Sequence, residues 1–193
     1  MIIGVPKEIK PDENRVSIIP FSVKRLIDLG SEVLVENNAG LASGYSNENY
    51  IESGAKIIES AKDVYALSDM IVKVKEPQNI EFDYIKDGQI VFTYFHFAAD
   101  KSLTDNFIKS NAIAISYETV QDENGNLPLL VPMSEVAGRM AIQNGAKALE
   151  ANMGGKGLLL SGVPGVDSAT VTILGGGIVG TNSAKLAAGL GAK

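Results

Sequence analysis

The chain has 193 residues, of which 45% are hydrophobic and 21% are charged, a balance typical of a globular protein with room for one full domain and part of a second. Its formal net charge of −6 at pH 7 argues against nucleic acid as a partner, and the absence of cysteine excludes disulfides and favours a reducing, cytoplasmic compartment. No apolar run approaches the roughly 18 residues that a membrane helix needs, and no basic segment precedes an apolar one as in a secretory signal, so no membrane association is expected.

Short apolar runs and helical patterns alternate over the first sixty residues. Pro20 suits a first helical position and Gly30 a helix stop, which predicts a helix over 20–30. Ser46 is a suitable cap for a short helix that reaches about Ser53. Strands are predicted between these helices, over residues 1–6, 31–36 and 55–59.

The same alternation continues to about residue 120. Ser60 and Asp63 have the spacing of a capping box, and a helix is predicted over 100–110. Further strands are predicted over residues 69–75, 89–96 and 112–118. Strands separated by helices indicate an α/β fold with a parallel sheet, here a first domain over residues 1–130 that ends after a polar loop.

The remaining residues, 131–193, are predicted to form a linker helix and the start of a second domain. The linker helix is expected over 134–155, with Ser134 as its cap and Gly154 as its end. Its apolar positions at helical spacing are Val136, Ala137, Met140, Ala141, Ala148 and Leu149. A Gly/Pro-rich loop follows, and an apolar strand at residue 170 opens the second domain.

The chain ends in a glycine turn between this strand and a helical pattern. Gly175, Gly177 and Gly180 fit G-x-G-x-x-G, in which the glycines permit the turn, the backbone's approach to a pyrophosphate and the packing of helix on strand. Ile178 and Val179, between the glycines, are expected to contact the cofactor, and the free N–H groups of the helix that follows would face the phosphates. This context predicts a Rossmann dinucleotide-binding unit, with a glycine turn that binds nothing as the alternative.

The acidic residue that holds the cofactor ribose normally lies about 20 positions after the first glycine. Counted from Gly175, that position lies beyond Lys193. The sequence therefore does not separate NAD from NADP.

His96 is the only histidine of the chain and follows an apolar strand, at the end where parallel sheets place ligands. Imidazole suits proton transfer near neutral pH, but a lone histidine after an aromatic strand is often a packed or capping residue. Tyr94 lies two residues earlier on the same face, as a pocket residue or a core residue.

Two cations are further candidates. Lys75 ends its strand and, taken alone, is a solvated lysine; Lys73 shares its face by alternation and is the residue most easily confused with it. Arg15 lies in a polar loop, either as an exposed partner of Asp12 and Glu13 or as a guanidinium that binds a carboxylate in a bidentate manner.

Five stretches together resemble the alanine dehydrogenase and pyridine nucleotide transhydrogenase family, on its alanine dehydrogenase branch. They are, in chain order, "GVPKEIKPDENRVSIIP", "VKVKEPQ", "TYFHFAAD", "PMSEVAGRMAIQNGAKALE" and "VTILGGGIVGTNSAKLAAGLGA". The resemblance implies NAD-dependent, reversible oxidative deamination of L-alanine to pyruvate and ammonia. It also implies two α/β domains with the active site between them, a homo-hexamer, and a chain that is the N-terminal fragment of a longer enzyme and inactive alone.

The resemblance also implies roles for individual residues. His96 would be the general acid/base, and Arg15, Lys75 and Tyr94 would bind the substrate. Met133 and Ser134 would lie beside the cofactor, and no metal would take part. A dinucleotide-binding subunit of a proton-translocating transhydrogenase is the alternative, and a stable domain without ligand chemistry is a third.

Overall fold

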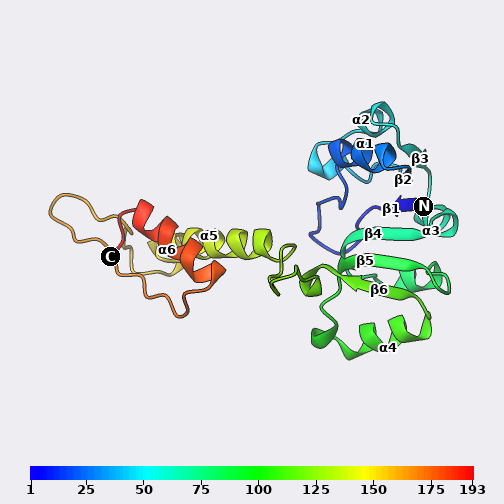
Figure 1. Cartoon of the computed structure of the whole chain (residues 1–193). Helices are drawn as coiled ribbons and strands as arrows, with labels where there is room; N and C mark the ends of the chain where they lie inside the picture. Colours follow the sequence, from blue (N-terminus) through cyan, green and yellow to red (C-terminus); the bar gives the residue numbers. More distant parts are fainter. The chain divides into compact units, whose positions relative to one another are not determined.

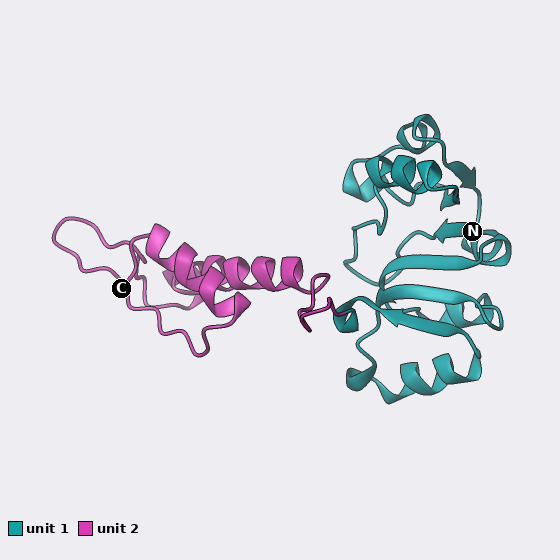
Figure 2. Cartoon of the chain, in the orientation of Figure 1, with its two compact units in different colours: residues 1–120 teal, residues 121–193 magenta.

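The computed structural model describes all 193 residues, Met1–Lys193, which form two compact units (Figure 1). The first unit comprises Met1–Val120 and the second Gln121–Lys193 (Figure 2). The division falls earlier along the chain than the expected boundary near residue 130, because the polar loop that begins at Gln121 belongs to the second unit.

The first unit is built on one six-stranded parallel sheet, which confirms the predicted α/β fold with a parallel sheet. Its strands are β1 (Ile2–Val5), β2 (Glu32–Glu36), β3 (Lys56–Ile58), β4 (Met70–Lys75), β5 (Ile90–Tyr94) and β6 (Ile113–Ser116). Their spatial order is β3-β2-β1-β4-β5-β6. The order reverses direction between β1 and β4, and ligands of such sheets bind at the carboxyl ends of the strands near this switch point.

Helices cover both faces of this sheet and enclose two apolar clusters. They are α1 (Pro20–Asp28), α2 (Asn47–Glu52), α3 (Ala61–Leu67) and α4 (Lys101–Lys109). Adjacent residues of β4 belong to different clusters, Val72 to one and Ile71 to the other, so the clusters lie on opposite faces. Val23 of α1 packs in the first cluster and Phe107 of α4 in the second.

The helix ends of this unit follow their capping residues. Pro20 occupies the first turn of α1 as predicted. Ser46 caps α2 in a capping box with Asn49, and the Ser60 side chain accepts from the backbone N–H of Asp63 at the start of α3.

The second unit contains helices α5 (Val131–Ala148) and α6 (Ile178–Gly189), which pack together at small residues. The Ser183 hydroxyl donates to the Gly138 carbonyl at 2.8 Å. A side chain at position 138 would come within 2.3 Å of the Val179 carbonyl oxygen, so this close approach requires glycine.

Three expectations for this unit are wrong. Ser134 does not cap α5: the helix begins at Val131 with Pro132 in its first turn, and the Ser134 N–H donates to the Leu130 carbonyl. Gly154 ends a short 3-10 turn that follows α5 rather than α5 itself. The expected apolar stripe is also displaced, because Gly138 and Ile142 are buried while Val136 and Met140 are exposed.

The predicted strand at residue 170 is not assigned to a sheet in the structure. The Val171 N–H donates to the Lys193 carbonyl at 2.8 Å, and the Lys193 N–H donates to the Ala169 carbonyl at 2.9 Å. This is one repeat of a parallel ladder, too short to form a strand pair.

Candidate active site

The candidate catalytic and substrate-binding residues of the first unit all lie at or just beyond the carboxyl ends of strands. Arg15 lies in the loop between β1 and α1, Lys75 ends β4, and Tyr94 ends β5 two residues before His96. Lys75 and Tyr94 are directly paired across the two strands. The sheet therefore brings these residues to one edge, on either side of the switch point between β1 and β4.

Arg15 is held by a neighbouring carboxylate. Its Nε donates to Glu13 Oε1 at 2.8 Å and its Nη2 to Glu13 Oε2 at 2.6 Å, a two-point contact that orients the guanidinium plane. The hydrogen bonds from Arg15 lower the pKa of Glu13, and the charge of Lys75 lowers it as well. Glu13 therefore stays ionised between the two cations.

The two lysines of β4 have different surroundings. Lys73 is fully buried and paired with Glu8 and Glu81, whereas Lys75 is partly exposed at the strand end. The register against β5 shifts between Val72 and Lys75, which interrupts the strict alternation of side chains. Of the two, Lys75 is the one accessible to a ligand.

His96 has a backbone conformation that is uncommon for a residue with a side chain. Its φ is 54°, in the left-handed region, and its N–H donates to Glu118 Oε1 at 2.7 Å. The imidazole is exposed and stacks on the Tyr94 ring, with centroids 6.2 Å apart and planes 14° apart. A residue held in a sparsely populated conformation beside a ligand-binding edge is a candidate for function.

Tyr94 links His96 to Arg15. Its ring also contacts Tyr117 edge-on, with centroids 4.7 Å apart. The Tyr94 side chain is half-buried. Burial raises the pKa of Tyr94, while the nearby positive charge of Arg15 lowers it. Arg15, Tyr94 and His96 thus form one neighbourhood rather than three separate surface sites.

A small hollow of about 220 Å³ lies beside Arg15 in the first unit. Its lining residues are Lys7, Glu8, Glu13, Asn14, Arg15, Asn38, Ala39 and Ala42. Lys75, Tyr94 and His96 do not line it, so this hollow covers only the Arg15 side of the predicted site.

The glycine turn of the second unit has the three properties that a dinucleotide-binding turn requires. Gly175 has a φ of +99°, which favours glycine. A side chain on Gly180 would come within 1.9 Å of the Gly175 carbonyl oxygen, whereas one on Gly177 would meet no atom within 4 Å. Gly177 is the N-cap of α6 and has no side-chain cap, so the helix N-terminus remains available to an anion.

An open pocket of about 590 Å³ lies beside this turn. All the predicted cofactor-binding residues except Met133 line it: Ser134, Gly175, Gly177, Ile178, Val179 and Gly180. Ser134 thus faces the pocket from the first turns of α5 although it does not cap that helix. These residues fit a dinucleotide by the open space at Gly177 and the uncapped helix end.

Comparison with known proteins decides the family. The model of the alanine dehydrogenase/PNT N-terminal domain matches residues 4–137, and that of the C-terminal domain matches residues 141–193. This chain belongs to the alanine dehydrogenase/PNT family. The family resemblance predicted from the sequence motifs is thereby confirmed.

Relatives within the family are similar over the whole of this chain. Alanine dehydrogenase from Bacillus subtilis is 56% identical over 192 residues, and that from Methanococcus maripaludis is 54% identical over 193 residues. The chain spans about half the length of these relatives, 50% and 52% respectively.

Solved structures of the family share the fold. An L-alanine dehydrogenase superposes with a TM-score of 0.93 at 49% identity, over 100% of this chain and 53% of that one. The transhydrogenase from Sinorhizobium meliloti superposes with a TM-score of 0.81 at 26% identity, over 100% of this chain and 57% of that one.

Several residues around the candidate site were not predicted from the sequence. Glu8 and Glu118 come from a polar loop and a short 3-10 turn, where no periodicity reveals which side chain points inward. Lys73 did carry a signal, since a lysine between valines inside a buried strand needs a buried partner.

No group of three His, Cys, Asp or Glu side chains in the structure is arranged to bind a metal ion. None of its helices is both long and apolar enough to cross a lipid bilayer.

Proposed function

We propose that this chain binds substrate and begins the cofactor site in an NAD-dependent alanine dehydrogenase, which interconverts L-alanine with pyruvate and ammonia. The observation that carries the proposal is the position of Arg15, Lys75 and His96 at one edge of the parallel sheet. Interconversion of a 2-oxo acid and its amino acid requires cations that bind the carboxylate and a group that transfers protons. The high identity to proteins named alanine dehydrogenase supports the choice of substrate.

Arg15 and Lys75 would hold the substrate by its negative charge. The guanidinium plane is already oriented by Glu13 and offers a two-point contact to a carboxylate. Lys75 would act as a point charge on the carboxylate or on the carbonyl oxygen of pyruvate. The partly buried Tyr94 ring would limit the space beside them to a small side chain.

His96 would move protons at the substrate α-carbon. In deamination, water adds to the imine carbon and loses a proton to the imidazole, which then returns a proton to the departing amine. The hydrogen bond from the His96 N–H to Glu118 and the contact with Tyr94 would hold the ring in place.

The nicotinamide cofactor would bind at the glycine turn of the second unit and would accept or donate the hydride. The N–H groups at the start of α6 would receive its pyrophosphate, and Gly177 would leave room for it. Met133 and Ser134 would lie at the nicotinamide end. The preference for NAD over NADP, a homo-hexameric state and a cytoplasmic location are also part of the proposal and rest on the family resemblance.

The dinucleotide-binding subunit of a transhydrogenase is a weaker candidate. The solved transhydrogenase is 26% identical to this chain, against 49% for the solved L-alanine dehydrogenase.

The test is a steady-state assay of the protein in its whole encoded length. Oxidation of NADH should require both pyruvate and ammonium, and NADPH should be a poor substitute. Oxidation without ammonium, or hydride exchange between two dinucleotides without pyruvate, would reject the proposal. Light scattering of the same sample would test the hexamer.

A further inference from the structure

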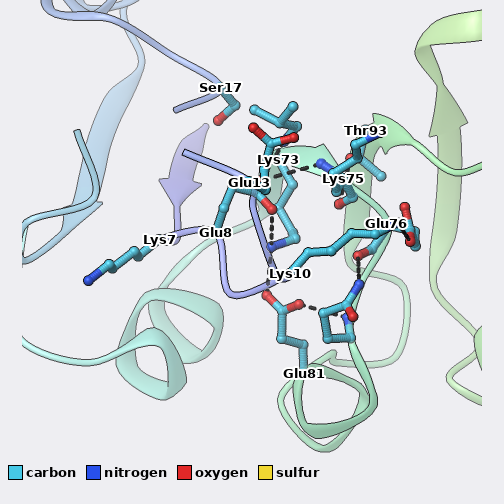
Figure 3. A network of polar contacts seen from close by, with 12 residues as sticks. Lys7, Glu8, Lys10, Glu13, Ser17, Lys73, Lys75, Glu76, Glu81 and Thr93 are labelled. Carbon is cyan, nitrogen blue, oxygen red and sulfur yellow. Dashed lines mark hydrogen bonds and ion pairs between the residues drawn. The ribbon is translucent and has the colours of Figure 1, made fainter. Parts of the chain in front are cut away.

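Side chains of the loop between β1 and α1 hydrogen-bond the backbone of β4 where its pairing with β1 ends. The two strands are paired only at Ile3 with Met70 and at Gly4 with Ile71. Beyond that point β1 still pairs with β2 at Val5 but no longer pairs with β4, and the backbone of β4 would lack partners on this side. Side chains of the loop replace the missing strand, and Figure 3 shows them around β4.

Two residues of the loop make these replacement hydrogen bonds. The Ser17 hydroxyl donates to the Val72 carbonyl at 2.6 Å. Glu8 Oε1 accepts from the Val74 N–H at 2.6 Å and, more weakly, from the Lys75 N–H at 3.4 Å. Glu8 precedes Arg15 along the loop and Ser17 follows it, so the segment that carries Arg15 is fixed to β4 at both ends.

Glu8 is itself held rigidly. Its side chain is 3% exposed, and its Oε2 accepts from Nζ of the fully buried Lys73 at 3.2 Å. Lys73 also donates to Glu81 Oε1 at 2.8 Å, and Glu81 in turn accepts from the Tyr65 hydroxyl and the Gln78 N–H. Each carboxylate therefore has several fixed partners (Figure 3).

This arrangement is costly as a means of stability alone. Two carboxylates share one ammonium in the interior, and buried ion pairs often contribute no more than apolar residues of the same size. Its location supplies another reason for it: Glu8 binds the last peptide groups of β4, next to Lys75, from the loop that carries Arg15.

We propose that Glu8 is a positioning residue that sets Lys75 against Arg15 and so fixes the spacing of the two cations that bind the substrate. The inference rests on the proposed function, in which both cations bind substrate. The positioning role depends on the hydrogen bond that Glu8 accepts from β4. The negative charge of Glu8 is secondary, because loss of this carboxylate leaves Lys73 and Glu81 as a balanced ion pair.

Three variants of the protein in its whole encoded length separate these roles. Glu8→Ala removes the acceptor and should raise the KM for pyruvate by about 10-fold to 100-fold, as expected for misplaced substrate-binding groups. Glu8→Gln keeps an acceptor oxygen for the Val74 N–H and should stay within about 3-fold of the unsubstituted protein. The matched control is Glu32→Gln, which removes an exposed glutamate paired with Lys56 in the same sheet and should change nothing.

The KM for NADH should stay unchanged in all three variants, and amide hydrogen exchange at Val74 should accelerate in Glu8→Ala but not in Glu8→Gln. An unchanged pyruvate KM in Glu8→Ala, or equal loss in Glu8→Gln, would overturn the proposal. If Glu8→Ala does not fold, Ser17→Ala takes its place and must raise the pyruvate KM for the proposal to stand.

Failure of the proposed function would be visible separately, in the unsubstituted protein, as NADH oxidation that does not depend on pyruvate. Amide hydrogen exchange at Val74 would then be the one test of whether Glu8 holds β4. Unchanged exchange in Glu8→Ala would overturn the positioning role of Glu8.

Discussion

At the scale of single residues, His96 combines an exposed ring with a backbone that is tightly fixed. Its left-handed conformation is secured by the hydrogen bond of its N–H to Glu118, and its ring rests on Tyr94. His96 is also the N-cap of the short 3-10 turn Phe97–Ala99. The geometry fits either role, and the first prediction separates them.

The first prediction tests this role with a substitution that respects the backbone. Asparagine tolerates the left-handed region, so His96→Asn should fold normally. It should lower kcat by about 100-fold or more, the usual scale for loss of a general acid/base. NADH affinity, measured by fluorescence titration, should be unchanged; a wild-type kcat across the pH range would remove His96 from the chemistry.

The second prediction concerns Arg15. Arg15→Lys keeps the positive charge but loses the planar two-point contact with Glu13 and with a carboxylate, so the pyruvate KM should rise by about 10-fold while NADH binding stays normal. Arg25→Lys, in the last turn of α1, is the matched control and should behave as the unsubstituted protein. Equal effects of the two substitutions would contradict a substrate role for Arg15.

At the scale of elements, two glycines of the glycine turn have different roles, one in packing within the turn and one in leaving space for a ligand. Gly180 allows close packing within the turn, because a side chain there would strike the Gly175 carbonyl oxygen. Gly177 faces open space, so a side chain there would disturb nothing in the chain itself. Substitution of Gly180 should therefore affect stability, and substitution of Gly177 should affect ligand binding.

The third prediction follows from that difference. Gly177→Val should weaken NADH binding with little change in thermal stability, because the side chain would block the backbone's approach to the pyrophosphate. Gly180→Ala should lower thermal stability, because the turn must shift to avoid the clash. Gly189→Ala, where a side chain meets no atom within 4 Å, is the control for both. Calorimetry and NADH titration would measure the two effects, and similar profiles for Gly177→Val and Gly180→Ala would refute the distinction.

The elements of the first unit could be predicted from the sequence because each carries its own signal. Buried parallel strands read as apolar runs, and Ser46 and Ser60 mark helix starts by local hydrogen bonds. The second unit was harder for a physical reason. Pro132 and Ser134 both suit the start of α5, and only packing on α6 selects the register; the expected strand at 170 depends on a partner strand that local sequence does not specify.

For the candidate site, position in the chain gave less. The carboxyl ends of parallel strands are ligand positions, which made Lys75 and His96 candidates, but their roles came from the family resemblance. The side chains that orient them come from loops, where direction depends on tertiary contacts. Glu8 is the clearest case, because nothing in its neighbourhood of alternating charges distinguishes it from an exposed residue.

At the scale of the whole molecule, the two units differ in how fully their cores are formed. The first unit encloses large buried side chains such as Tyr50, Tyr65 and Phe95 on the faces of a six-stranded sheet. The buried cluster of the second unit consists of Ile142, Leu160 and Ala187 only. Greater burial of apolar surface gives the first unit the larger share of the stability.

The last prediction concerns a polypeptide limited to these 193 residues, about half the length of the alanine dehydrogenase from Bacillus subtilis. The open pocket beside its glycine turn is bounded by the segment 171–174, which belongs to no sheet, and Leu174 is 95% exposed. A wall held by a single ladder repeat, between Val171 and Lys193, does not hold a ligand in a fixed geometry, and catalysis requires such geometry. This polypeptide should therefore show no alanine-dependent NADH formation, although amides of β4 and β5 should be strongly protected from hydrogen exchange. A rate comparable with that of the Bacillus subtilis enzyme would contradict this and show that the glycine turn and α6 suffice to bind the cofactor. Protected amides without activity would show that the activity is lost in the second unit rather than in the substrate site.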